Sequence, residues 1–177
     1  RFLETGQPEH LSWIHSSGQG DKGSRGLNHM AHEGLLDWII GGHFGPATKI
    51  QDMIAQNKIQ AYNLPQGVIS HMFRDMTAKR PTITRIGLET FVDPRVEGGK
   101  LNSLTTEDIV ELMELDGTEY LHYHHVKKPD YAFLRGTYAD ERGNISLEEE
   151  PCYLESLQAA QAVKNNGGTV FVQVKQV

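Results

Sequence analysis

Short apolar runs alternate along the chain with amphipathic stretches, which predicts strands alternating with helices. Strands are expected at residues 10–15, 38–42, 59–62, 82–87, 130–140 and 169–174. Helices are expected at residues 27–38, 46–57, 65–80 and 153–166, where apolar side chains recur at helical spacing. The opening RFLETG is typical of the last turn of a helix that stops at a glycine.

This alternation predicts an α/β fold, with an open, mainly parallel sheet and helices on both of its faces. One local pattern departs from it. The β-like runs VELMEL and TEYLHY flank Asp116-Gly117, the residue pair that a type I′ turn requires. We therefore expect an antiparallel hairpin insertion around Asp116-Gly117.

Composition narrows the class of protein. The 177 residues are 38% hydrophobic and 23% charged, which suits one globular domain. A net charge of −6 argues against nucleic-acid binding, and apolar runs such as LLDWII are too short to cross a membrane. The single cysteine, Cys152, excludes internal disulfides and favours the reducing cytoplasm. We expect Cys152 to be a semi-buried small hydrophobe rather than a nucleophile.

The nine histidines include two clusters. His29 and His32 stand three residues apart in HMAHE, and YLHYHH contains His122, His124 and His125. Neither spacing is a zinc signature, and nothing in the sequence fixes further ligands. A polar helix face and a solvated hairpin strand explain the clusters better, so no metal site is assigned.

Two glycine-rich loops are candidate anion sites. GGHFG at residues 41–45 lies between a strand and a helix, where backbone N–H groups can approach an anion. A tight turn without a ligand explains it equally well. FVDPRVEGGK at residues 91–100 carries Asp93, Arg95, Glu97 and Lys100, and a salt-bridged surface loop is favoured over anion binding there.

YNLPQG at residues 62–67 connects a predicted strand to a predicted helix. Pro65 suits the first helical turn, so Gln66 should project beyond the end of the strand. The Gln66 amide offers donors and an acceptor that can orient a carboxylate, an ester carbonyl or water. Asn63 can do the same, or it can cap the helix.

Several stretches together resemble the first, alpha-type half of the family I coenzyme A transferases, closest to the acetate/propionate branch. They are GQGDKGSRGLNHMAHEGL, GGHFG, KIQAYNLPQG, GLETFVDPRVEGGKLN, DYAFLRGTYADERGNISLEEE and AVKNNGGTVFVQV. The resemblance implies that residues 1–177 form a single alpha-type domain. It also implies that the family's first strand and helix, and its whole second half, are missing.

The resemblance implies transfer of coenzyme A between an acyl-CoA and a short-chain carboxylate through a glutamyl-CoA thioester. The glutamate would lie downstream of this chain, so no catalytic residue is assigned, and this segment alone should be inactive. Glu89 stands where a small residue is expected. Coenzyme A would be a substrate, and no cofactor or metal is implied. The substrate-binding residues would be Gln66, Asn63, Gly41, Gly42, Thr90 and Phe91.

The implied setting is short-chain fatty acid metabolism in the cytoplasm. The expected partners are a second transferase half, on the same or another chain, and further copies of the protein in a homo-oligomer. Neither nucleic acid nor membrane is expected. Two alternatives stay open. One is another α/β enzyme, such as a sugar-phosphate isomerase or a deaminase, and the other is a non-catalytic domain that binds an acyl metabolite or has a regulatory role.

Overall fold

The computed structural model describes residues 2–125 and 127–177. The chain divides into two compact units. One comprises Arg1–Ile69 and Ile83–His124, and the other Ser70–Thr82 and His125–Val177. The single domain expected over residues 1–177 stays a prediction.

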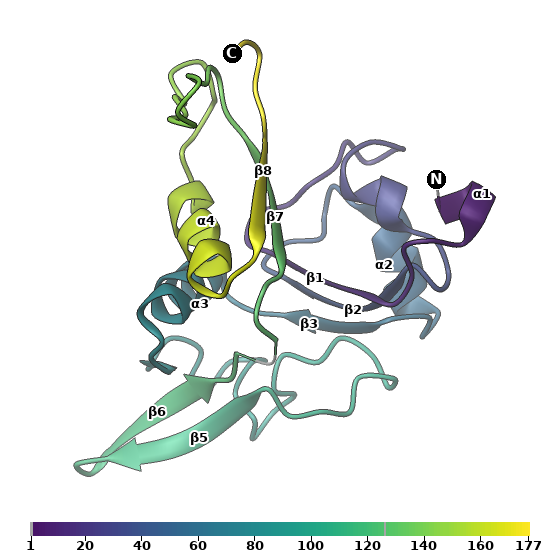
Figure 1. Cartoon of the computed structure of the whole chain (residues 1–177). Coiled ribbons are helices and arrows are strands. Elements are labelled where there is room, and N and C mark those ends of the chain that lie inside the picture. Colours follow the sequence, from purple (N-terminus) through teal and green to yellow (C-terminus); the bar gives the residue numbers. More distant parts are fainter. Residues whose placement is uncertain (1, 126) are drawn as a thin grey trace. The chain divides into compact units, whose positions relative to one another are not determined.

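A three-stranded parallel sheet organises the first unit (Figure 1). Its order is β1-β2-β3, formed by β1 (Leu11–His15), β2 (Leu36–Gly41) and β3 (Gln60–Asn63). Helix α2 (Thr48–Ala55) connects β2 to β3 and turns Ile50, Met53 and Ile54 inward. These side chains pack with Leu36, Ile39 and Ala61 of the sheet in one core, since their spacing places them on one helix face.

The prediction that RFLETG is the last turn of a helix that stops at a glycine is confirmed. Helix α1 (Phe2–Thr5) stops at Gly6, whose φ of 70° lies in the left-handed region. The Gly6 N–H donates to the Phe2 carbonyl at 2.7 Å, as at a glycine C-terminus. Arg1 lies outside the described residues.

The helix expected over residues 27–38 is wrong. Only a short 3-10 helix, η1 (Leu27–Met30), forms, and strand β2 already begins at Leu36. Gly34 adopts a φ of 84°, which breaks any helical path between them. Residues of two different elements therefore produced the apparent helical spacing.

The hairpin insertion is confirmed. Strands β5 (Val110–Leu115) and β6 (Thr118–Tyr123) pair antiparallel, and β4 (Thr82–Thr84) completes a sheet of order β4-β6-β5. Asp116 and Gly117 have φ values of 52° and 73°, both positive as a type I′ turn requires.

The second unit is built on a parallel β-α-β arrangement. Strands β7 (Tyr131–Arg135) and β8 (Thr169–Gln173) pair in parallel, and α4 (Ser156–Asn165) joins them and packs on both. Most of α3 (Gln66–Ala78) belongs to this unit, where the Asn165 amide donates to the Thr77 carbonyl at 2.9 Å.

The predicted α/β class with parallel strands and one antiparallel insertion is thus confirmed, although the parallel pairs lie in two sheets. Within the described residues, no helix combines the length and apolar character that a membrane span needs. Cys152 is exposed, so the expected semi-buried position is wrong. It lies in the irregular stretch before α4, which buries few side chains.

Candidate functional site at the carboxyl edge of the first sheet

The carboxyl ends of the three parallel strands stop level with one another. Gly41 of β2 pairs in register with His15 of β1 and with Asn63 of β3. The loops that follow all three strands therefore leave from one edge of the sheet. Ligands of open α/β sheets bind at this edge. The predicted glycine loop and the YNLPQG turn are thus neighbours.

Asn63 fastens the YNLPQG turn to the glycine loop. Its side-chain amide donates to the Gly41 carbonyl at 2.8 Å, and the Leu64 N–H donates to the same oxygen at 3.2 Å. The Asn63 amide is therefore a donor to another strand. The alternative that Asn63 caps the following helix is wrong, because α3 begins only at Gln66 and no N–H group of its described first turn donates to the Asn63 side chain.

Gln66 is the first residue of α3, and its side chain is exposed. Gly42 lies directly against it. A Cβ atom on Gly42 would fall 2.5 Å from Gln66 Cγ and 2.4 Å from the Ser16 carbonyl oxygen, so only glycine fits without a shift. This contact brings Gly42 and Gln66 together as predicted from sequence.

Ser16 is a residue of this edge that the sequence analysis missed. It directly follows β1 and is 3% exposed, and its hydroxyl donates to the Gln66 carbonyl at 3.3 Å. A single serine in a glycine-rich stretch carries no signal by itself. Only the pairing of β1 with β2 places it here.

His15 was missed for the same reason. It ends β1, is 3% exposed and packs edge-on against Phe44 with ring centroids 5.3 Å apart. Its Nε2 contacts the His43 carbonyl at 3.4 Å, so we assign the proton of the neutral ring to Nε2. Among the described residues its Nδ1 has no hydrogen-bond partner. Burial lowers the pKa of His15 to about 4.

Asn28 fixes the glycine-rich loop at residues 16–26 to the start of α2. This side chain is 2% exposed, and its amide donates to the carbonyls of Arg25 and Pro46 at 3.0 and 3.2 Å. Its Oδ1 accepts the Lys49 N–H at 3.0 Å. Asn28 thereby satisfies one of the unpaired N–H groups of the first turn of α2.

Thr90 and Phe91 lie in the loop that follows β4. The Phe91 carbonyl accepts the Gly99 N–H at 3.1 Å, and the Gly99 carbonyl accepts the Asn63 N–H at 2.8 Å. Phe91 is therefore connected to Asn63 through Gly99, and its side chain is 41% exposed. The Thr90 hydroxyl donates within its own loop, to the Gly87 carbonyl at 2.7 Å.

Three of the four charged residues of the loop at 91–100, namely Asp93, Arg95 and Lys100, are held in ion pairs. Asp93 is fully buried and binds Arg95 at 2.7 Å, and this hydrogen bond holds the pKa of Asp93 well below its usual range. Arg95 also contacts Glu119 at 3.2 Å, and Lys100 contacts Asp108 at 2.6 Å. These contacts agree with the salt-bridged loop favoured from sequence over an anion site.

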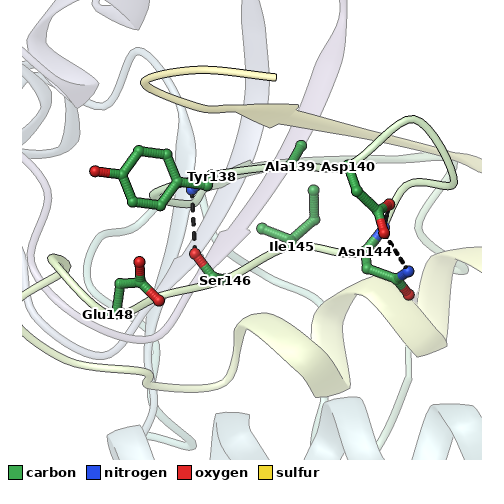
Figure 2. Close-up of a pocket in the computed structure, with 7 residues that line it drawn as sticks. All are labelled: Tyr138, Ala139, Asp140, Asn144, Ile145, Ser146 and Glu148. Atoms are coloured by element: carbon green, nitrogen blue, oxygen red, sulfur yellow. Dashed lines mark hydrogen bonds between the residues drawn. The ribbon is translucent and has the colours of Figure 1, made fainter.

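A pocket of about 400 Å³ lies elsewhere, in the second unit (Figure 2). It contains none of the predicted site residues. Asp140 accepts hydrogen bonds from the backbone of Arg142 and Asn144 and from the Asn144 amide. The Asp140 carboxylate, one of the two that line this pocket, is thus engaged by its own loop.

The edge formed by Ser16, Gly42, Asn63 and Gln66 can present amide and backbone groups to a carboxyl or acyl group. A helix start lies at the same place, since α3 begins at Gln66, and its partial positive charge favours an anion. Such an arrangement could orient and polarise a bound carboxyl or acyl group. It contains no group that we assign as a nucleophile.

Comparison with known proteins gives close matches. A model of the coenzyme A transferase family matches residues 8–177. Acetate CoA-transferase YdiF of Escherichia coli (strain K12) is 46% identical over 178 residues, and caffeate CoA-transferase of Acetobacterium woodii is 49% identical over 175. These alignments cover 100% and 98% of this chain but 33% of each relative, so the chain spans about a third of their length.

The crystal structure of the acyl-CoA transferase YdiF from Escherichia coli O157:H7, described as a thioester complex with CoA, superposes on the chain with a TM-score of 0.95. The identity is 46%, and the match covers 99% of this chain and 34% of that one. The fold of the two units is therefore that of the corresponding part of YdiF.

Proposed function

Because the chain belongs to the coenzyme A transferase family, we propose that it is part of an enzyme that moves coenzyme A from an acyl-CoA to a short-chain carboxylate. The match over residues 8–177 carries this proposal. The similarity to an acetate CoA-transferase favours acetate- or propionate-like substrates.

In the proposed reaction, a glutamate outside this chain attacks the thioester carbonyl of the acyl-CoA. The C–S bond breaks, and the acyl-glutamyl anhydride forms as the CoA thiolate leaves. The thiolate then attacks the glutamyl carbonyl, which releases the original acyl group as a carboxylate and leaves glutamyl-CoA. An acceptor carboxylate reverses the two steps. The thioester complex described for YdiF supports this route.

This chain would form the wall that holds the acyl or carboxylate group. The exposed Gln66 amide would donate to the carboxylate or to the carbonyl oxygen that gains charge in the transition state. Gly41 and Gly42 would line the wall beside it, with Asn63 keeping the turn in place. Thr90 and Phe91 would border the same site from the neighbouring loop.

The remaining parts of the enzyme would come from sequence beyond this chain. We propose a second transferase half, supplied by the same or a partner chain, which contributes the nucleophile. The relatives are about three times as long as this chain, which leaves room for such a half in one polypeptide. We further propose that the intact protein forms homo-oligomers and acts in the cytoplasm.

The test is CoA transfer between acetyl-CoA and propionate by the intact protein, followed as propionyl-CoA formation. Replacing Gln66 by Ala should lower turnover by a factor of about ten or more, because a donor to the developing charge is lost. Gln56→Ala is the matched control. Gln56 is an exposed glutamine that follows the last residue of α2, and its loss should leave the rate unchanged.

An unchanged rate in Gln66→Ala would remove Gln66 from the site. Stabilisation of the intact protein by sugar phosphates, with no response to CoA, would instead favour a sugar-phosphate isomerase. Binding of acyl-CoA without any transfer would favour the non-catalytic domain.

A further inference from the structure

One cluster of side chains outside the proposed site combines two histidines with a carboxylate. Glu111 of β5 pairs in register with His122 of β6. His124 lies one residue beyond the end of β6, and its ring centroid is 4.2 Å from that of His122. Glu111 Oε2 lies 3.3 Å from His124 Nε2 and 3.9 Å from His122 Nδ1. One ligand atom of each residue lies within 4.8 Å of the others.

The backbone beneath this cluster is firmly held. On the opposite face of the hairpin, Val110, Leu121 and Tyr123 are at most 2% exposed. The Tyr123 hydroxyl donates to the Ile86 carbonyl at 2.7 Å, and the His124 N–H donates to the Ile109 carbonyl at 2.8 Å. The register that brings Glu111 beside the histidines is therefore fixed by a buried face, because a slip would expose these side chains.

The two distances from Glu111 to the histidines suit a small cation, and the three ligand atoms all lie within 4.8 Å of one another. Zn²⁺ bonds of about 2.0–2.1 Å in a tetrahedral arrangement separate neighbouring ligand atoms by about 3.3 Å. The Glu111–His124 distance of 3.3 Å already meets this value, and the Glu111–His122 distance of 3.9 Å is close to it. The side chains of Glu111 and His124 are 65% and 41% exposed, which leaves solvent access for a water ligand.

The donor set selects the kind of ion. Two imidazoles suit Zn²⁺, Cu²⁺ and Ni²⁺, whereas Ca²⁺ and Mg²⁺ prefer sites made of oxygen ligands alone. The ligating form of histidine is the neutral one.

We propose that Glu111, His122 and His124 form a binding site for a divalent transition-metal ion, with Zn²⁺ as the natural probe. The ion would join β5 to β6 across the hairpin, and the site is separate from the proposed transfer of CoA. This departs from the expectation of no metal site, which considered the histidines without a third ligand. The competing explanation is a histidine–carboxylate ion pair that holds no metal.

Calorimetric titration of Zn²⁺ into the intact, chelator-treated protein without a histidine tag tests the proposal, at a pH near 7.5 where free imidazole is neutral. Each of Glu111→Gln, His122→Gln and His124→Gln should weaken the binding by at least about tenfold, because each removes a ligand. His29→Gln, at an exposed histidine of the other cluster, should bind Zn²⁺ like the wild type.

Unfolding curves recorded without metal confirm that the variants fold. A Co²⁺-loaded wild type, measured by visible absorption, gives a second readout that needs no substitution. Absorption bands of Co²⁺ coordinated by imidazole, which disappear when Zn²⁺ is added and displaces the Co²⁺, would support the site. Zn²⁺ affinity that is unchanged in all three variants, or no Zn²⁺ binding to the wild type, would overturn the proposal.

Discussion

The titratable ring of His15 is buried at the end of β1, beside the residues proposed to bind substrate. An unfolded chain protonates this ring near its ordinary pKa of 6.5, but the folded protein does so only near a pKa of about 4. Between these values the unfolded state binds the extra proton. Acid therefore favours unfolding through this window, and the stability contribution is complete above pH 6.5.

We predict that the free energy of unfolding falls by up to about 3 kcal/mol from pH 6.5 to pH 4 because of His15. In His15→Gln this part of the pH dependence should disappear. Urea unfolding of the intact protein across the window measures it, with His29→Gln as the exposed control that keeps the wild-type slope. Equal slopes for His15→Gln and the wild type would contradict the assignment.

At the residue scale, the local sequence was enough to place some residues at the carboxyl edge of the first sheet but not others. Gln66 and Gly42 were found because a proline, a glutamine and glycines between a strand and a helix already indicate a ligand turn. His15, Ser16 and Asn28 were missed because their partners lie 18 to 50 residues away. Such partners become neighbours only when the order of the strands is known.

The turn after β2 and the start of α3 meet without spare space. A side chain at position 42 would enter the space of the Ser16 carbonyl and of Gln66. At position 67, one residue into the same helix, an added Cβ would have no heavy atom of the described residues within 4 Å. These two glycines therefore make a matched pair for testing the contact between the elements.

We predict that Gly42→Ala lowers the free energy of unfolding by about 1–3 kcal/mol, because the Ser16 carbonyl oxygen and Gln66 Cγ must both move away from the new Cβ atom. Gly67→Ala should be neutral or stabilising by up to about 1 kcal/mol, because alanine suits a helix better than glycine. Urea denaturation of the intact protein compares the two variants. Equal stability for both would show that the close approach at Gly42 is absent.

At the element scale, patterns with a strong local cause were predicted best. The hairpin formed because Asp116 and Gly117 both tolerate positive φ between two β-like runs. The helix that was wrongly predicted at residues 27–38 rested on the spacing of apolar residues alone, with no capping or turn residue to support it. Gly34 interrupts it, and burial of Leu36 and Ile39 in the sheet outweighs the helical spacing.

At the scale of the whole molecule, the described chain spans about a third of the length of its curated relatives. In the proposed site, the edge at Gly42 and Gln66 would orient a ligand, but it supplies no assigned nucleophile. If transfer needs a glutamate from elsewhere, a protein made only of residues 1–177 has the wall of a site without its reactive group.

We therefore predict that the isolated 177-residue segment shows no CoA transfer above background, whereas the intact protein is active. Circular dichroism of the segment first establishes that it is folded. The acetyl-CoA and propionate assay then compares the two proteins at equal concentration. Turnover by the folded segment at the rate of the intact protein would place the nucleophile within these residues.

The absence of side chains at Gly41 and Gly42 limits how this part of the proposed site can evolve. In the proposed site a ligand would meet only main-chain atoms at these two positions, and substitutions elsewhere in the chain do not change main-chain chemistry. A Cβ is excluded at Gly41 by the ring of His15 and at Gly42 by Ser16 and Gln66. New acyl preferences would therefore have to arise in the surrounding loops, while these two positions stay invariant.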